Sequence, residues 1–214
     1  MKYKYVVFDF NGTILNDVEL CHNLLNEMLE MKGLKTISRE RYKEIFTFPI
    51  IEYYKRAGFD FSNYSFEDLA QYFIDKYQPL SLKIQIDNKL IQLFEYLKQH
   101  RIKMIVLSAS KRDNLIEQLN HFNLSLYFED ILGISDIYAR EKIDIAKDYF
   151  NKMKINPSDV LFIGDTLHDL EIANYFNSDC ILVNFGHQDE KLFLNTNAKV
   201  ISSFDEVKNL LWLN

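Results

Sequence analysis

Short apolar runs alternate with amphipathic stretches along this chain of 214 residues. Four runs are apolar without interruption, and two weaker runs resemble them: 5–8, 104–107, 160–163 and 180–183, then 131–134 and 200–201. Continuous apolarity over a short run is typical of strands that are covered on both faces, as in parallel sheets. The runs therefore predict a buried parallel sheet.

Between these runs, apolar residues recur at intervals of three and four, which predicts amphipathic helices. The stripes are Cys21, Leu24, Leu25 and Met28; Leu90, Leu93, Phe94 and Leu97; Leu115, Leu119 and Phe122; Ile143, Ala146, Phe150 and Met153; and Phe204, Val207, Leu210 and Leu211. Gly33 resembles a helix stop, and Ser65 with Asp68 resembles a capping box. From about residue 103, strand and helix alternate, which predicts a doubly wound α/β fold.

The first two strong strands are separated by residues 10–102, far more than one connection requires. A crossover helix needs only about a dozen residues, and residues 86–100 suffice for it. The surplus is helical in pattern. We therefore expect a Rossmann-like doubly wound parallel sheet core, formed by residues 1–16 and 84–214, with a helical insertion at 17–83 after strand 1.

Composition excludes several classes of protein. The chain has 25 Lys and Arg against 31 Asp and Glu, a net charge of −6, which argues against nucleic-acid binding. No apolar run reaches the length of a membrane span, and the start does not resemble a signal peptide. Cys21 and Cys180 lack metal-ligand spacing and are expected to be reduced core residues. These features predict a cytoplasmic protein without nucleic-acid or membrane partners.

Acidic and hydroxyl residues directly follow three of the predicted strands. Asp-Phe-Asn-Gly-Thr occupies 9–13, Ser-Ala-Ser-Lys occupies 108–111, and Gly-Asp-Thr-Leu-His-Asp occupies 164–169. A single Asp after a strand is often only a helix N-cap. Open parallel sheets bind ligands at the carboxyl ends of their strands, so the three segments together predict one site.

These segments resemble the motifs of the haloacid dehalogenase superfamily, in the branch that contains phosphoglycolate phosphatases and β-phosphoglucomutases. Residues 9–13 resemble its first motif, Asp-x-Asp-Gly-Thr; Ser108 matches the second; and residues 164–169 match the fourth. Lys142 is the best match to the third-motif lysine, with Arg140 as the alternative. That branch carries a helical cap after its first strand, where this chain has its helical surplus.

The resemblance implies Mg²⁺-dependent hydrolysis of small phosphate monoesters, phosphoglycolate phosphatase-like, through an aspartyl-phosphate on Asp9. A carboxylate can approach an anionic phosphate only when cations offset the repulsion, and Mg²⁺ prefers a few carboxylates together with phosphate oxygens. The implied catalytic residues are Asp9, Asn11, Ser108 and Lys142. The implied metal ligands are Asp9, Asn11 through its backbone carbonyl, Asp165 and Asp169. The implied phosphate contacts are Asn11, Gly12, Ser108, Ala109 and Lys142.

Asn11 departs from this pattern, because the phosphatases and mutases of the family have an Asp there that acts as general acid and base. An amide cannot exchange a proton at pH 7, and general acid–base catalysis contributes about 10²–10⁴-fold. Four interpretations remain open. The chain is a slow phosphatase or one restricted to good leaving groups; another group, such as His168, His187 or a cap residue, supplies the proton; the chemistry is phosphonatase-like and uses a cap lysine; or the protein binds a phosphorylated ligand without catalysis.

The insertion is expected to select the substrate, a small phosphorylated metabolite. Phe48, Tyr53 and Arg56 are the candidate specificity residues, and the hinges of the cap are expected near 16–17 and 79–83. The segment 186–188, Gly-His-Gln, follows a strand on the same sheet edge and is interpreted as a turn in preference to a catalytic loop. The protein is expected to be a monomer or a homodimer.

Overall fold

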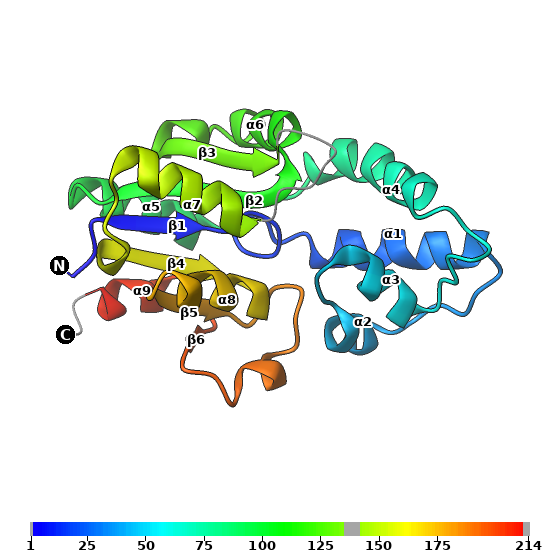
Figure 1. The fold of residues 1–214 in the computed structure, drawn as a ribbon. Helices are drawn as coiled ribbons and strands as arrows, with labels where there is room; N and C mark the ends of the chain where they lie inside the picture. The colour runs from blue at the N-terminus through cyan, green and yellow to red at the C-terminus, as the bar shows by residue number, and fades with distance from the viewer. Residues whose placement is uncertain (1, 135–141, 212–214) are drawn as a thin grey trace.

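A six-stranded parallel sheet forms the centre of the larger part of the molecule (Figure 1). The structure is a computed structural model that describes residues 2–134 and 142–211. Its strands are β1 (Tyr5–Phe8), β2 (Lys103–Lys111), β3 (Phe128–Ile134), β4 (Val160–Gly164), β5 (Asp179–Val183) and β6 (Lys199–Ile201). The strand order is β3-β2-β1-β4-β5-β6. The α/β fold with a Rossmann-like parallel sheet is thus confirmed.

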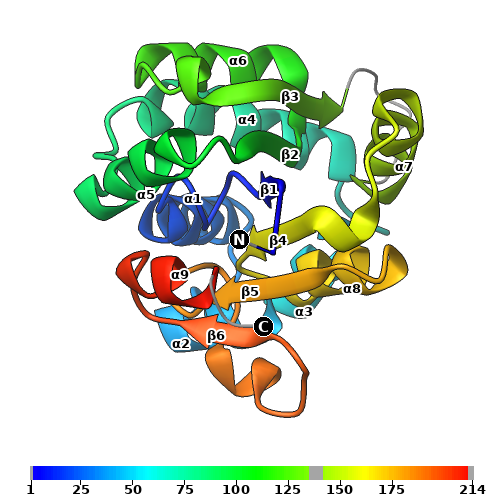
Figure 2. The same ribbon diagram turned by 90° about the vertical axis from the view of Figure 1, so that its left-hand side faces the viewer.

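Helices cover both faces of this sheet. Figure 2 shows α5 (Asn88–Gln99) and α9 (Asp205–Leu210) on one face, and α7 (Lys142–Met153) and α8 (Leu167–Tyr175) on the other. Helix α6 (Arg112–His121) packs with the α5 side through Leu115 and Leu119. Short 3₁₀ turns lie at Ser125–Tyr127, Pro157–Asp159 and Glu190–Phe193. Because the central strands are covered on both sides, their middles are continuously apolar, as at residues 6–8, 104–107 and 160–163.

Four helices form a separate helical unit beside the sheet (Figure 1): α1 (Val18–Met31), α2 (Arg39–Ile45), α3 (Ile50–Ala57) and α4 (Phe66–Ser81). This helical unit has its own apolar core, made by residues between Val18 and Leu80. Ser65 Oγ accepts a hydrogen bond from Asp68 N at the start of α4, and Gly33, with φ of 66°, follows the end of α1. Ser65 is therefore the N-cap of α4, which is one half of the expected capping box, and the helix stop at Gly33 is confirmed. The division at 17–83 is consistent with this core and stays a prediction.

The carboxyl ends of the strands point toward the helical unit (Figure 1). Strands β2 and β3 lie on one side of β1, and β4, β5 and β6 lie on the other. The strand order therefore reverses between β1 and β4. Phe8 of β1 lies in register with Ile163 of β4 and with Val106 of β2. This topological switch point is where open α/β sheets bind ligands. It brings the segments after β1, β2 and β4 to one place.

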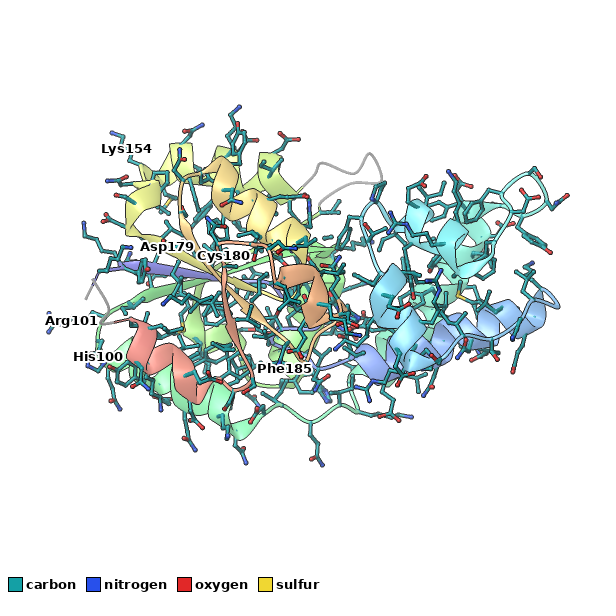
Figure 3. All side chains as sticks on the ribbon, turned by 90° about the horizontal axis from the view of Figure 1, so that it is seen from below. His100, Arg101, Lys154, Asp179, Cys180 and Phe185 are labelled. Carbon is teal, nitrogen blue, oxygen red and sulfur yellow. The ribbon has the colours of Figure 1, made fainter. Side chains whose placement is uncertain are left out.

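Two details of the sequence pattern need correction or comment. Met153 was expected on the buried stripe of α7, but it is 50% exposed because it is the last residue of that helix. Cys21 and Cys180 are both buried and free, as predicted. Cys180 lies on β5 within the sheet (Figure 3), whereas Cys21 lies on α1. Arg140, the alternative to Lys142, lies outside the described residues. Within the described residues, no helix is long and apolar enough to cross a membrane.

Candidate active site

Three carboxylates meet at the carboxyl ends of β1 and β4. Asp9 follows β1, Asp165 follows β4, and Asp169 lies in the first turn of α8. One oxygen of each lies within 4.8 Å of the others. Lys142 Nζ, at the start of α7, lies 2.6 Å from Asp9 Oδ1 and 2.8 Å from Asp169 Oδ1. Four residues predicted from the sequence are thus brought together: Lys142 contacts Asp9 and Asp169, and an oxygen of Asp165 lies within 4.8 Å of both carboxylates.

Two of the three carboxylates accept hydrogen bonds from backbone N–H groups. Asp169 Oδ2 accepts hydrogen bonds from Thr166 Oγ1 at 2.8 Å and from the backbone N–H groups of Thr166 and Asp165. Asp165 Oδ2 accepts from His187 N at 2.6 Å. Gly12 has φ of 73°, and a Cβ there would lie 2.1 Å from Asp165 Oδ2. A side chain at position 12 would therefore displace a candidate metal ligand.

The charges of this cluster do not balance. Three carboxylates face one lysine, which leaves two excess negative charges when all are ionised. Burial raises the pKa of Asp9 to about 6 and raises the pKa of Asp165 well above its usual range, although Lys142 and His187 oppose these shifts. Burial would also raise the pKa of Asp169, but Lys142 outweighs it and lowers that pKa. Oxygen ligands with an excess of two negative charges fit Mg²⁺.

Magnesium binding is expected to weaken as the pH falls from 7.5 to 5. A cation binds the ionised carboxylates, and at pH 5 only about a tenth of a group with a pKa near 6 is ionised. We expect the apparent affinity for Mg²⁺ to fall at least about tenfold over this range, measured by isothermal titration calorimetry. In Asp9→Asn the binding should be weaker and its pH dependence flatter. An affinity for Mg²⁺ that is the same at pH 5 and 7.5 would contradict the assignment.

Ser108 lies on β2, beside β1, and only 1% of it is exposed. Its Oγ accepts a hydrogen bond from Ser110 N at 3.0 Å. Ser108, Ala109 and Ser110 line a cavity of about 330 Å³ together with Asp9, Lys142 and Asp165. The segment after β2 is thus adjacent to the carboxylates, where the sequence predicts phosphate contacts.

Asn11 is held by three hydrogen bonds. Its Nδ2 donates to Asp17 Oδ2 at 2.9 Å and to Tyr77 Oη at 2.6 Å, and its Oδ1 accepts from Ser110 Oγ at 2.9 Å. Because a carboxylate only accepts, the Asp17 contact fixes which side of the amide carries the hydrogens. The amide nitrogen thus already donates toward two neighbouring acceptors, and an amide has no proton to transfer to a leaving group.

Asp17 was not predicted as a functional residue. Its position before α1 resembles an N-cap, but its side chain does not cap that helix. Its carboxylate is fully buried and accepts from Gly12 N, Tyr77 Oη, Asn11 Nδ2 and His187 Nε2. These partners lower the pKa of Asp17 although burial alone would raise it. Asp17 therefore joins the β1 turn, α4 and the loop after β5.

The segment 186–188 has a larger role than the turn expected from its sequence. His187 Nε2 lies 3.1 Å from Asp17 Oδ1, its Nδ1 lies 2.7 Å from Tyr42 Oη, and its ring stacks on Phe46. Gln188 Nε2 donates to Phe46 O at 2.9 Å. The loop thus fastens the helical unit to the sheet while its backbone holds Asp165. A Gly-His-Gln tripeptide carries no signal for such contacts.

Replacing His187 with alanine is expected to lower the free energy of unfolding by about 3 kcal/mol, because Asp17 would lose its buried ring partner. Urea unfolding measures this change. His168→Ala is the control, since the His168 partner, Glu171 at 3.4 Å, is exposed to solvent and such screened pairs contribute under about 1 kcal/mol. Equal losses in the two variants would contradict a stabilising His187–Asp17 pair.

Two of the three candidate specificity residues line the cavity. Phe48 and Tyr53 line it, whereas Arg56 on the same helix as Tyr53 is not among the described lining residues. His168 packs against Phe48 with ring centroids 5.0 Å apart. The cavity also contacts Asp17, Tyr77 and His187, which sequence reasoning did not bring together.

Comparisons with known proteins agree with this geometry. A sequence profile described as haloacid dehalogenase-like hydrolase matches residues 6–183. The N-acetylmuramic acid 6-phosphate phosphatase of Pseudomonas aeruginosa is 26% identical over 196 residues, which cover 87% of this chain and 84% of that protein. A crystal structure of a predicted phosphatase from Clostridium acetobutylicum has a TM-score of 0.83 at 23% identity over 100% of both chains, which supports the fold.

A further relative covers less of its own length. The tyrosine-protein kinase PtkA of Mycobacterium tuberculosis is 23% identical over 114 residues, which cover 51% of this chain but only 39% of PtkA. The profile match spans well over half of this chain. The chain therefore belongs to the haloacid dehalogenase-like hydrolases.

Proposed function

We propose that this protein is a Mg²⁺-dependent phosphatase that hydrolyses small phosphate monoesters through an aspartyl-phosphate on Asp9. The observation that carries the proposal is the cluster of Asp9, Asp165 and Asp169 around Lys142 Nζ at the switch point of the sheet. Phosphoryl transfer requires a placed nucleophile and cancellation of charge on the phosphoryl oxygens. The cluster offers a nucleophile together with groups that can bind the cations needed.

Asp9, Asp165, Asp169 and the backbone carbonyl of Asn11 are the residues that would hold Mg²⁺. When bound, the ion would offset the negative charge of the phosphate. Lys142 adds a fixed positive charge between Asp9 and Asp169, whose carboxylates raise its pKa although burial would lower it. Ser108 Oγ and the segment after β2 are the proposed donors to the phosphoryl oxygens.

The proposed reaction has two steps. In the first, an oxygen of the Asp9 carboxylate forms a bond to phosphorus while the bond between phosphorus and the ester oxygen breaks, and the electron pair leaves with that oxygen. In the second, the oxygen of a water molecule forms a bond to the same phosphorus while the bond between phosphorus and the Asp9 oxygen breaks. The electron pair returns to the Asp9 carboxylate, a proton of the water goes to solvent, and phosphate leaves. Since the amide of Asn11 cannot transfer a proton at pH 7, the leaving oxygen takes its proton from solvent. Esters of weakly basic leaving groups should therefore react fastest.

Two other interpretations receive less support. A phosphonatase would need a lysine of the helical unit at the site, but among the described residues the cavity lysines are Lys111 and Lys142, neither from that unit. Lys43 donates to Asn184 O, and Lys55 pairs with Glu52. A silent phosphate-binding protein would keep the same cluster. Turnover separates it from a phosphatase.

The test is phosphate release from p-nitrophenyl phosphate and a panel of small phosphate monoesters. We expect turnover with Mg²⁺, loss of at least about 10²-fold when the metal is removed with EDTA, and recovery when Mg²⁺ is added back. Absence of turnover on every ester, together with Mg²⁺-dependent binding of inorganic phosphate, would instead support the silent binding protein. Turnover that EDTA leaves unchanged would contradict the proposal.

A further inference from the structure

The cavity beside Asp9 extends into the helical unit as a chamber with aromatic walls. We define the aromatic chamber by Phe46, Phe48, Tyr53, Phe66, Phe73 and Tyr77, all of which line this cavity of about 330 Å³. They come from α3, from α4 and from the segment between α2 and α3. Asp9, Asp165 and Ser108 line the same cavity, so a ligand whose phosphate lies at Asp9 has its leaving group facing aromatic side chains.

The chamber offers little to a second negative charge. Among its described lining residues the lysines are Lys111 and Lys142, and no arginine is present. Lys142 is committed to Asp9 and Asp169, and the Lys111 side chain is 66% exposed with Asp113 at 3.9 Å. His187 uses both ring nitrogens, toward Asp17 and Tyr42. A leaving group that carries a carboxylate or a second phosphate would therefore be poorly bound here.

The chemistry at Asn11 also favours an aromatic leaving group. Without a general acid, a phosphate ester of an alkyl alcohol reacts slowly, because its alkoxide is a poor leaving group. A phenolate is far less basic and needs no proton as the bond breaks. An aromatic leaving group thus satisfies both the chemistry at Asn11 and the walls of the chamber.

We infer, on the basis of the proposed function, that the substrate class is an aryl phosphate monoester, with its ring in the aromatic chamber. The ring would make edge and face contacts with the chamber side chains, while its ester oxygen lies beside Asp9. Binding of the ring is therefore expected to be measurable with ligands that are not hydrolysed.

Binding of two phosphonates, which are not hydrolysed, tests ring recognition directly. We expect wild-type protein with Mg²⁺ to bind phenylphosphonate at least about tenfold more tightly than methylphosphonate, measured by calorimetry or as competitive inhibition constants. Equal affinities would overturn the inference. Because no bond breaks, this comparison is independent of leaving-group chemistry.

A matched pair of variants on α4 locates the effect. Ala70 lines the cavity, whereas Gln71 is exposed and outside the described lining. Ala70→Leu should remove most of the preference for phenylphosphonate by filling the chamber, and Gln71→Leu should retain it. A preference that survives in Ala70→Leu would overturn the placement of the ring.

The outcomes for the inference and for the proposed function differ. Asp9-dependent turnover without any preference for phenylphosphonate would refute the aryl substrate and leave the phosphatase intact. A preference for phenylphosphonate without turnover of any ester would refute the phosphatase and identify an aryl phosphate-binding protein.

Discussion

Asp9→Asn is expected to reduce turnover by about 10⁴-fold or more, because an amide does not attack phosphorus and the two other carboxylates of the cluster are engaged, Asp165 by His187 N and Asp169 by Lys142 and Thr166. The change keeps the shape of the side chain. Lys142 retains Asp169 at 2.8 Å, and one buried negative charge is removed. Since burial already raises the pKa of Asp9 to about 6, its ionised form does not stabilise the fold at pH 7. The melting temperature of Asp9→Asn should therefore equal or exceed that of the wild type.

The control is Asp179→Asn. Asp179 lies at the start of β5 (Figure 3), at the opposite end of the strands from the acidic cluster, and pairs with Lys2 at the surface. Its replacement should leave turnover unchanged. Retention of more than about a hundredth of wild-type turnover in Asp9→Asn, with this control active, would contradict a nucleophilic role for Asp9.

The second large effect is expected from exchanging Asn11 and Asp17. In the wild type, the Asn11 amide donates to Asp17 Oδ2 at 2.9 Å, so Asn11→Asp alone would bring two buried carboxylates together, and one of them would have to hold a proton. In the double variant Asn11→Asp with Asp17→Asn, the new amide at 17 can donate to the new carboxylate. Its oxygen can still accept from Gly12 N and His187 Nε2.

The exchange puts an ionisable group at the position that the family uses for its general acid. We expect turnover of methyl phosphate to rise by about 10²-fold in the double variant, while turnover of phenyl phosphate, whose leaving group needs no proton, changes much less. Each single variant should melt at a lower temperature than the double variant, since one juxtaposes two carboxylates and the other two amides. A double variant that is no faster on methyl phosphate and no more stable than the single variants would contradict this interpretation of Asn11.

The sheet and its chemistry were predictable because their signals are local. Each strand is a short apolar run, and Asp9 and Asp165 directly follow two of them. Parallel topology then brings such residues to one edge. Lys142 was identified through its family motif, and it lies at the first position of α7, with Asp9 and Asp169 as partners.

The connections between the helical unit and the sheet were not predictable in this way. Asp17 resembles an N-cap, His187 resembles part of a turn, and Tyr77 resembles a core residue of an amphipathic helix. They meet only because residues 60 and 170 positions apart from Asp17 fold against it. The aromatic chamber likewise depends on how three segments of the helical unit face the sheet, which no single stripe encodes.

The most direct test of the central claim is detection of the phosphoryl group on Asp9. Wild-type protein with Mg²⁺ and excess p-nitrophenyl phosphate is quenched with acid during turnover, and the peptides are analysed by mass spectrometry. The account predicts one phosphoryl group on the peptide that contains Asp9, absent without Mg²⁺ and absent in Asp9→Asn. Turnover that proceeds while this peptide remains unmodified, with the phosphoryl group on another residue, would contradict it.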